Sequence, residues 1–355
     1  MGHRWGKIVV AVTAVVLSVI AGVAPSRARR DDVPTTPVSV LSSAPTATPD
    51  PAIAAAPTPS ITATPGPPTD AELRRLAANE LGRVPIVSWH DVADQDTRWD
   101  TSITTFRKQL LDLYRNGYRP VSIGEFIDGT FDVAPGTTPV VLTFDDSFRS
   151  HLFFDDDGEP HADSVVGTLE AFARRHRDWR ATAVFYLFWP RPFREAGQVD
   201  RKVRWLLGHG YELGNHGLHH DDLSAMNDDE VERSLATLQA EIAEIEPGFR
   251  FRSLALPFGI WPSNRRLAVE GTWDGERYSH DVVVLVGDMP ASPPYHTDHD
   301  PMYVPRVQSH ELGAWLAWLE RDRRRFISDG DPVVVTYPAS VGDSIRPAPR
   351  VVRAY

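Results

Sequence analysis

Short apolar runs separated by helical patterns are the feature that most restricts the fold of this chain. PVVLTF (139–144) and ATAVFYLF (181–188) are almost continuously apolar, which is typical of strands buried on both faces. Similar short runs are VPIVSW (84–89), SLALPF (253–258), DVVVLV (281–286) and PVVVTY (332–337). Helical patterns lie between them, and residues 229–245 show the clearest apolar spacing of three and four. This alternation predicts an α/β fold with a parallel sheet, either closed into a barrel or open and doubly wound.

The first 68 residues have a different composition from the rest. In residues 1–30 a basic start is followed by 17 uncharged, mostly apolar residues (8–24), which predicts a signal peptide. An uncleaved membrane anchor through residues 8–24 is the alternative. Residues 31–68, rich in Pro, Thr and Ala, contain no aromatic residue and predict a disordered linker. We therefore expect a secreted or cell-surface domain at 69–355, starting with a helix that a capping box at Thr69 opens and Gly82 ends.

Composition excludes several kinds of function. The chain has no cysteine, which rules out a cysteine nucleophile, a thiolate metal site and disulfide bonds. The net charge is −11, although residues 1–30 contain five Lys or Arg residues and no acid, so the remainder is still more acidic. An acidic surface repels phosphate backbones, and we expect no nucleic-acid partner.

Two adjacent carboxylates, Asp145 and Asp146, follow the 139–144 run directly. In parallel α/β folds the chemistry lies at the carboxyl ends of the strands, where this pair falls. A turn or helix cap is the simpler explanation for one such acid. For the pair, one carboxylate could bind a cation while its neighbour remains a base.

Three histidines in GNHGLHH (214–220) supply possible partners for that cation. His216 and His220 lie four apart, and on a helical turn this spacing brings two imidazoles to one face; His219 is the competing choice. One Asp with two His residues leaves coordination positions open, which is the catalytic arrangement for zinc. Cobalt, nickel or manganese would also be accommodated.

TFDD (143–146), GNHGLHH and LPFG (256–259), in this order, resemble the polysaccharide deacetylases of the NodB-homology type, carbohydrate esterase family 4. VPIVSWHDV resembles the first strand of the subgroup that acts on poly-N-acetylglucosamine, and the resemblance extends from about Val84 to Trp261. It implies a distorted (β/α) barrel. It also implies metal-dependent removal of acetyl groups from N-acetylglucosamine-containing or other acetylated polysaccharides.

The resemblance also implies a role for each motif residue. Asp145 matches the catalytic base, whereas Asp146, His216 and His220 match the ligands of a divalent metal, most often zinc. His219 is then a bystander.

The third motif, LPFG (256–259), contains the residues expected to contact the substrate. A backbone N–H near Phe258, with Pro257 and Gly259, is expected to bind the oxyanion or the substrate. Asn215 precedes the histidines as it does in relatives and is expected to support the site.

Several motif positions depart from the family pattern. Gly217 stands where relatives have Ser or Thr, and Ser147 replaces the usual glycine. Ala255 stands where many relatives have an arginine oriented toward the base, and Arg252, three residues away, is not assigned that role.

The residue expected to act as general acid has no direct match in this sequence. Relatives often end their last strand in a histidine, but Tyr337 is found at about that place, and a phenol is a poor proton donor. His90 and His310 are possible substitutes. Asp281 and Asp288 are candidates for the family's fourth motif by proximity only.

Two other functions remain open. A carbohydrate-binding protein that kept the fold and lost turnover would explain the missing arginine and histidine. A metal-dependent hydrolase of a small amide or ester would need a closed pocket, whereas a polysaccharide enzyme needs an open groove. Trp189, Trp261 and Trp273 are either core residues or platforms for sugar rings.

Overall fold

A computed structural model describes residues 67–321, 323–346 and 350–355. The predicted signal segment and residues 31–66 of the predicted linker lie outside the described residues. Among the described residues, no helix is long and apolar enough to cross a membrane.

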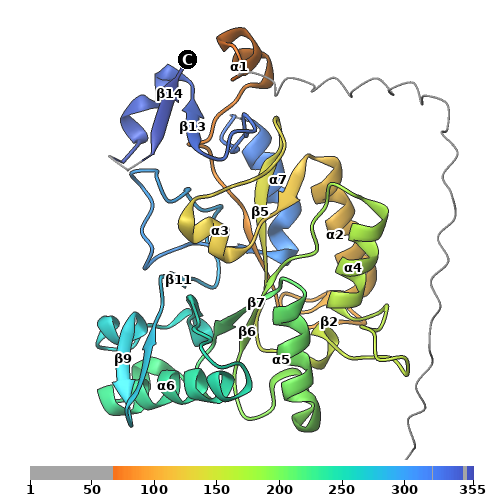
Figure 1. The fold of residues 1–355 in the computed structure, drawn as a ribbon, viewed down its shortest axis with the longest axis vertical. Helices are drawn as coiled ribbons and strands as arrows, with labels where there is room; N and C mark the ends of the chain where they lie inside the picture. The colour runs from red at the N-terminus through yellow and green to blue at the C-terminus, as the bar shows by residue number, and fades with distance from the viewer. Residues whose placement is uncertain (1–66, 322, 347–349) are drawn as a thin grey trace, which may run out of the picture. The chain divides into compact units, whose positions relative to one another are not determined.

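A curled parallel sheet of eight strands forms the centre of the domain (Figure 1). Its strands are β1 (Ile86–Trp89), β4 (Tyr118–Pro120), β5 (Thr138–Phe144), β6 (Val184–Leu187), β7 (Glu212–Asn215), β8 (Ser253–Ala255), β11 (Val282–Val284) and β12 (Val307–Gln308). They lie in the order β11-β8-β7-β6-β5-β1-β12, with β4 also paired to β5. Because β5, β6, β7 and β8 follow one another in one direction, the sheet has the connectivity of a barrel rather than a doubly wound fold. The predicted distorted (β/α) barrel is confirmed.

Most of the helices pack on the outer face of this sheet, whereas the short helix at 123–128 packs with the inner-face residues. The helices are α1 (Asp70–Leu76), α2 (Ile103–Arg115), α3 (Ile123–Asp128), α4 (Val165–Arg175), α5 (Val199–Gly208), α6 (Asp228–Ile245) and α7 (Leu312–Arg321). The remaining strands are β2 (Val92–Ala93), β3 (Thr101–Ser102), β9 (Glu270–Trp273), β10 (Glu276–Ser279), β13 (Val334–Tyr337) and β14 (Val351–Ala354). The predicted first helix is shorter than expected. Its capping box at Thr69 forms, but Ala77 takes a left-handed conformation and ends α1 there, before Gly82.

The residues of β5 alternate between two cores. Val140, Leu142 and Phe144 pack with apolar side chains of the outer helices, whereas Val141 packs on the inner face of the sheet. All seven residues of β5 are buried, as predicted for a strand covered on both sides. Since side chains alternate along a strand, the side chain of Asp145 continues the inner face.

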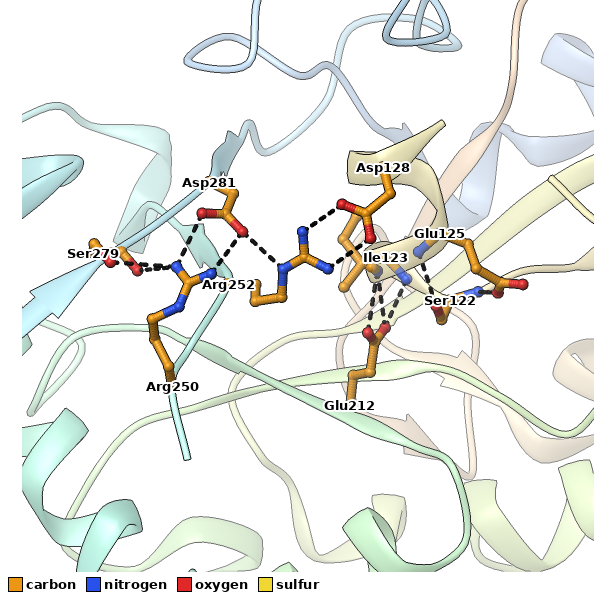
Figure 2. Close-up of polar contacts among 10 residues, drawn as sticks. Ser122, Ile123, Glu125, Asp128, Glu212, Arg250, Arg252, Ser279 and Asp281 are labelled. Carbon is orange, nitrogen blue, oxygen red and sulfur yellow. Dashed lines mark hydrogen bonds and ion pairs between the residues drawn. The ribbon is translucent and has the colours of Figure 1, made fainter. Parts of the chain in front are cut away.

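Ion pairs close the amino-terminal end of the half-barrel (Figure 2). Arg252, directly before β8, donates to Asp128 at the end of α3 and to Asp281, directly before β11, with N···O distances of 2.7 Å to each carboxylate. Glu212, the first residue of β7, accepts a hydrogen bond from the backbone N–H of Ile123 in α3 at 2.7 Å. Arg252 and Asp281 therefore join strands to α3 at the end opposite Asp145, and Asp281 is not part of the site.

The placement predicted for Tyr337 is wrong. The PVVVTY run does form a strand, β13, but β13 pairs with β14 and is not part of the main sheet. β12 occupies the place beside β1. β13 instead packs near α1: the N–H of Glu80 donates to the carbonyl of Thr336, and Arg353 in β14 pairs with Asp70.

Candidate active site at the carboxyl ends of the strands

Asp145 lies on the inner face of the half-barrel, and its side chain is almost completely buried. Its backbone N–H donates to the carbonyl of Trp89 in β1 at 2.9 Å, which holds the end of β5 in register. Both carboxylate oxygens accept hydrogen bonds from Arg306 at 2.7 Å, in a bidentate pair. Burial by itself would raise the pKa of Asp145, but the charge and hydrogen bonds of Arg306 hold that pKa well below its ordinary value.

Arg306 is the functional residue that the sequence analysis missed. It directly precedes β12 and is fully buried, with side-chain exposure of 0%. Its guanidinium also donates to the Thr143 hydroxyl at 3.1 Å and to the Leu285 carbonyl at 2.5 Å. The structure therefore places an arginine on Asp145 although Ala255 has replaced the one expected in the third motif. No spacing in the sequence indicated it, because 161 residues separate the two partners.

Asp146 points away from its neighbour because the chain turns at this residue. Asp146 and Ser147 have positive φ angles of 66° and 40°, a conformation uncommon for residues other than glycine. Its Oδ1 lies 3.3 Å from Nε2 of His216 and 3.2 Å from Nε2 of His220, and this buried oxygen makes no hydrogen bond. Burial opposes its ionisation, but the nearby imidazoles outweigh burial and lower the pKa of Asp146.

His216 follows β7 directly and is held in one tautomer. Its Nδ1 lies 2.7 Å from the carbonyl of Ala255. Since a carbonyl can only accept a hydrogen bond, Nδ1 carries the proton, and the unprotonated Nε2 is left as a possible metal ligand. His220 lies on the same loop, with its ring 4.8 Å from that of His216. The spacing of four residues works here through a loop, not through the expected helical turn, since Gly217 and His220 both have positive φ angles.

Ligand atoms of Asp146, His216 and His220 all lie within 4.8 Å of one another, and in the described part of the chain no other group of three such residues has this geometry. Two imidazole nitrogens and one carboxylate oxygen can hold a divalent cation and leave coordination positions open. The buried oxygen of Asp146 without a hydrogen bond fits a ligand position. His219 is not one of these three residues, and its Nδ1 contacts the carbonyl of Trp189 at 3.1 Å.

Asn215 orders the histidine loop. Its buried side chain donates to the Leu235 carbonyl in α6 and accepts from the N–H of Gly217. The hydroxyl of Ser234 accepts a further hydrogen bond from the N–H of Leu218. These contacts with α6 stabilise the loop even though Gly217 lacks a hydroxyl.

The turn at Pro257–Gly259 forms one wall of the site. Pro257 is buried, whereas Phe258 has a φ of 57° and is 59% exposed, with its ring 4.5 Å from that of His220. Gly259 has a φ of 71°, and a Cβ added there would lie 2.7 Å from a methyl group of Val286. Glycine is therefore required for the turn to approach the segment that follows β11.

A cavity of about 330 Å³ joins these residues. Its lining residues are His90, Trp99, Asp100, Asp145, Asp146, Phe148, His216, His220, Leu256, Phe258 and Val286. His90 lies with Nε2 3.9 Å from Oδ2 of Asp145, and burial is the main reason that its pKa is lowered. Its backbone carbonyl contacts the ring of His151 at 2.7 Å, which fixes the end of β1.

Four other predicted residues lie outside this cavity. His310 and Asp288 line a neighbouring cleft, and Tyr337 belongs to the apolar core with Val335. Trp273 on β9 packs partly buried against an apolar cluster beside α6.

Residues 132–271 match the model of the polysaccharide deacetylase family. The deacetylase PplD of Streptococcus pyogenes, solved in complex with acetate, is 15% identical, covers 66% of this chain and 98% of its own, and has a TM-score of 0.50. A polysaccharide deacetylase from Bacillus cereus is 15% identical over 66% of this chain and 69% of its own, with a TM-score of 0.48. IcaB from Ammonifex degensii is 18% identical over 68% of this chain and 98% of its own, with a TM-score of 0.43.

The family match agrees with the motifs, and the likeness to PplD agrees with the observed fold. The family match includes Asp145, Asp146 and the histidine loop, and it ends two residues before the end of β9. Residues 132–271 are therefore similar to the polysaccharide deacetylase family over the segment that contains both carboxylates and the histidine loop.

Proposed function

We propose that this domain is a metal-dependent deacetylase that removes acetyl groups from an N-acetylglucosamine-containing or other acetylated polysaccharide. The observation that carries the proposal is the shared cavity of Asp145 with the cluster of Asp146, His216 and His220. A base and a three-ligand cation site beside each other are what the hydrolysis of an amide or ester by an activated water requires.

Each carboxylate has one role in this reaction. Asp146, His216 and His220 would hold a divalent ion, which would polarise the acetyl carbonyl and make a water molecule more acidic. Asp145, kept ionised by Arg306, accepts the proton of that water as its oxygen attacks the carbonyl carbon. The bond from the acetyl carbon to the sugar nitrogen or oxygen then breaks, and acetate is released.

The proton that the leaving sugar amine needs comes from the same cavity. His90 is the imidazole closest to Asp145 outside the cation site, and Tyr337 and His310 do not line the cavity. We assign His90 the role of passing to the leaving group the proton that Asp145 accepts from water. The backbone of the Phe258 turn provides the N–H for the developing oxyanion.

Zinc fits the nitrogen-rich ligand set, and cobalt, nickel or manganese are the other candidates. The acidic composition, the lack of cysteine and the predicted signal segment support an extracytoplasmic location, either secreted or tethered to a membrane through residues 8–24.

Acetate release from acetylated chito-oligosaccharides tests the proposal. Metal-stripped protein is compared with protein reloaded with zinc or cobalt, next to an Asp145→Asn variant. We expect metal-restored release in the wild type, about 10²–10⁴-fold slower release in the variant, and one bound metal per chain in both.

A His216→Ala variant should lose the metal, and a His219→Ala variant should keep it, as measured by elemental analysis. No acetate from any of these substrates, despite one bound metal, would favour the carbohydrate-binding function or a small-molecule substrate.

A further inference from the structure

Exposed large apolar side chains gather in two places among the described residues. One group, Val333, Val351 and Val352, lies on and beside β13 and β14. The other consists of Trp99, Phe258, Ile260 and Tyr303, which are between 37% and 59% exposed. Trp99 and Phe258 line the cavity, and Ile260 follows Phe258 two residues along the chain.

Trp261 and Tyr303 form an aromatic pair at the outer end of this group. Their ring centroids are 4.9 Å apart at an angle of 33°. The guanidinium of Arg265 lies 5.5 Å from the ring of Trp261 and 5.7 Å from that of Tyr303, and it donates to the Tyr303 hydroxyl. Trp261 also packs against the apolar cluster beneath it, so the position of the pair is fixed.

The pair is joined to the cavity by short, rigid connections. Only Gly259 and Ile260 separate Phe258 from Trp261, and three residues span at most about 10 Å. The turn at Gly259 packs against Val286, which also lines the cavity. Tyr303 is next to Val304, which forms a bridge with Val284 at the end of β11.

We propose that Trp261 and Tyr303 form an outer subsite that binds a sugar ring of the same polysaccharide chain whose acetyl group enters the cavity. This inference rests on the proposed function and specifies its substrate as a polymer. A pyranose ring has a face of C–H groups that packs on an aromatic surface, and the exposed guanidinium of Arg265 can donate to its hydroxyl or acetyl oxygens. Neither Trp261 nor Tyr303 lines the cavity, so a small amide or ester bound there does not require this pair.

Dependence of the rate on chain length tests the subsite. For acetylated chito-oligosaccharides of two to six sugars, we expect wild-type kcat/KM to rise with length. In Tyr303→Ala and Trp261→Ala, kcat/KM for the hexamer should fall about tenfold, which corresponds to one lost stacking contact, so that the ratio of hexamer to dimer approaches one. Tyr303 is exposed, so its variant should fold even if Trp261→Ala does not.

The control is Trp315→Ala, which alters the half-buried Trp315–Trp318 pair on α7 and should leave the ratio unchanged. An undiminished ratio in Tyr303→Ala would overturn the subsite. If the wild type releases no acetate, calorimetric binding of the hexamer to the Asp145→Asn protein decides the question separately. Binding weakened about tenfold by Tyr303→Ala supports the subsite without the activity, whereas unchanged or absent binding rejects it.

Discussion

Replacing Arg306 by methionine should destabilise the protein strongly, because it leaves a buried carboxylate without its partner. The side chains of Arg306 and Asp145 are 0% and 3% exposed, so water cannot replace the lost contacts. Two charge-assisted hydrogen bonds of 2.7 Å disappear, and removal of one member of a buried ion pair typically costs about 3–5 kcal/mol. Methionine keeps much of the aliphatic stem, so the cavity contributes little. We therefore expect the free energy of unfolding to fall by about 3–5 kcal/mol in urea titrations of metal-free protein.

A second substitution separates the contribution of the unpaired charge to the free energy of unfolding from the contribution of lost packing. In Arg306→Met with Asp145→Asn, no unpaired charge remains in the interior, and we expect this double variant to be about 1–3 kcal/mol more stable than Arg306→Met alone. Arg107→Met serves as the control, since its pair with Asp163 is 45% and 63% exposed and should change stability by less than about 1 kcal/mol. A double variant that is no more stable than Arg306→Met would refute the explanation by buried charge.

Two other predictions concern the stability of the fold. Burial raises the pKa of Glu80 to about 8 from 4.5, so its protonation stabilises the folded state fully below pH 4.5, and this contribution is lost as the pH rises to about 8. The free energy of unfolding of the wild type relative to Glu80→Gln should therefore fall by about 1.4 kcal/mol per pH unit in that range, and an equal pH dependence in both proteins would contradict it. A Cβ at Gly214 would lie 2.3 Å from the ring of Tyr186, so Gly214→Ala should lower the free energy of unfolding by about 1–3 kcal/mol. Gly313→Ala on α7, where nothing lies within 4 Å, should raise it by up to about 1 kcal/mol.

Local patterns were sufficient to predict the strands and the residues at their ends. The apolar run of β5 predicted a strand buried on both faces, and it placed the aspartate pair at a carboxyl end. The histidine motif predicted which imidazoles come together, but not how. A spacing of four residues suits a helix, whereas the structure achieves it with positive φ angles at Gly217 and His220.

Contacts between distant segments were not predictable from one sequence. No recognisable motif surrounds Arg306 in the sequence. The pairing of β12 with β1 is what brings it to Asp145. For Tyr337 the sequence predicted a contact with the site that the fold does not form. A short apolar strand has the same pattern whichever sheet it joins, so PVVVTY could be recognised as a strand but not assigned to β13 outside the barrel.

Aspartate and arginine residues pair at both ends of the half-barrel, but at the carboxyl end one aspartate is left without an arginine. At the amino-terminal end, Asp281 accepts hydrogen bonds from both Arg250 and Arg252, so its charge is balanced within the protein (Figure 2). At the carboxyl end, the hydrogen bonds of Arg306 go to Asp145, Thr143 and Leu285, and none goes to Asp146. Since the left-handed turn at Asp146 moves its carboxylate toward two imidazoles, its buried Oδ1 is left without a hydrogen bond. Buried polar atoms are rarely left this way unless a ligand satisfies them. The pairing of Asp145 therefore makes Asp146 available to a cation, and the division of roles between the two carboxylates follows from which one the arginine reaches.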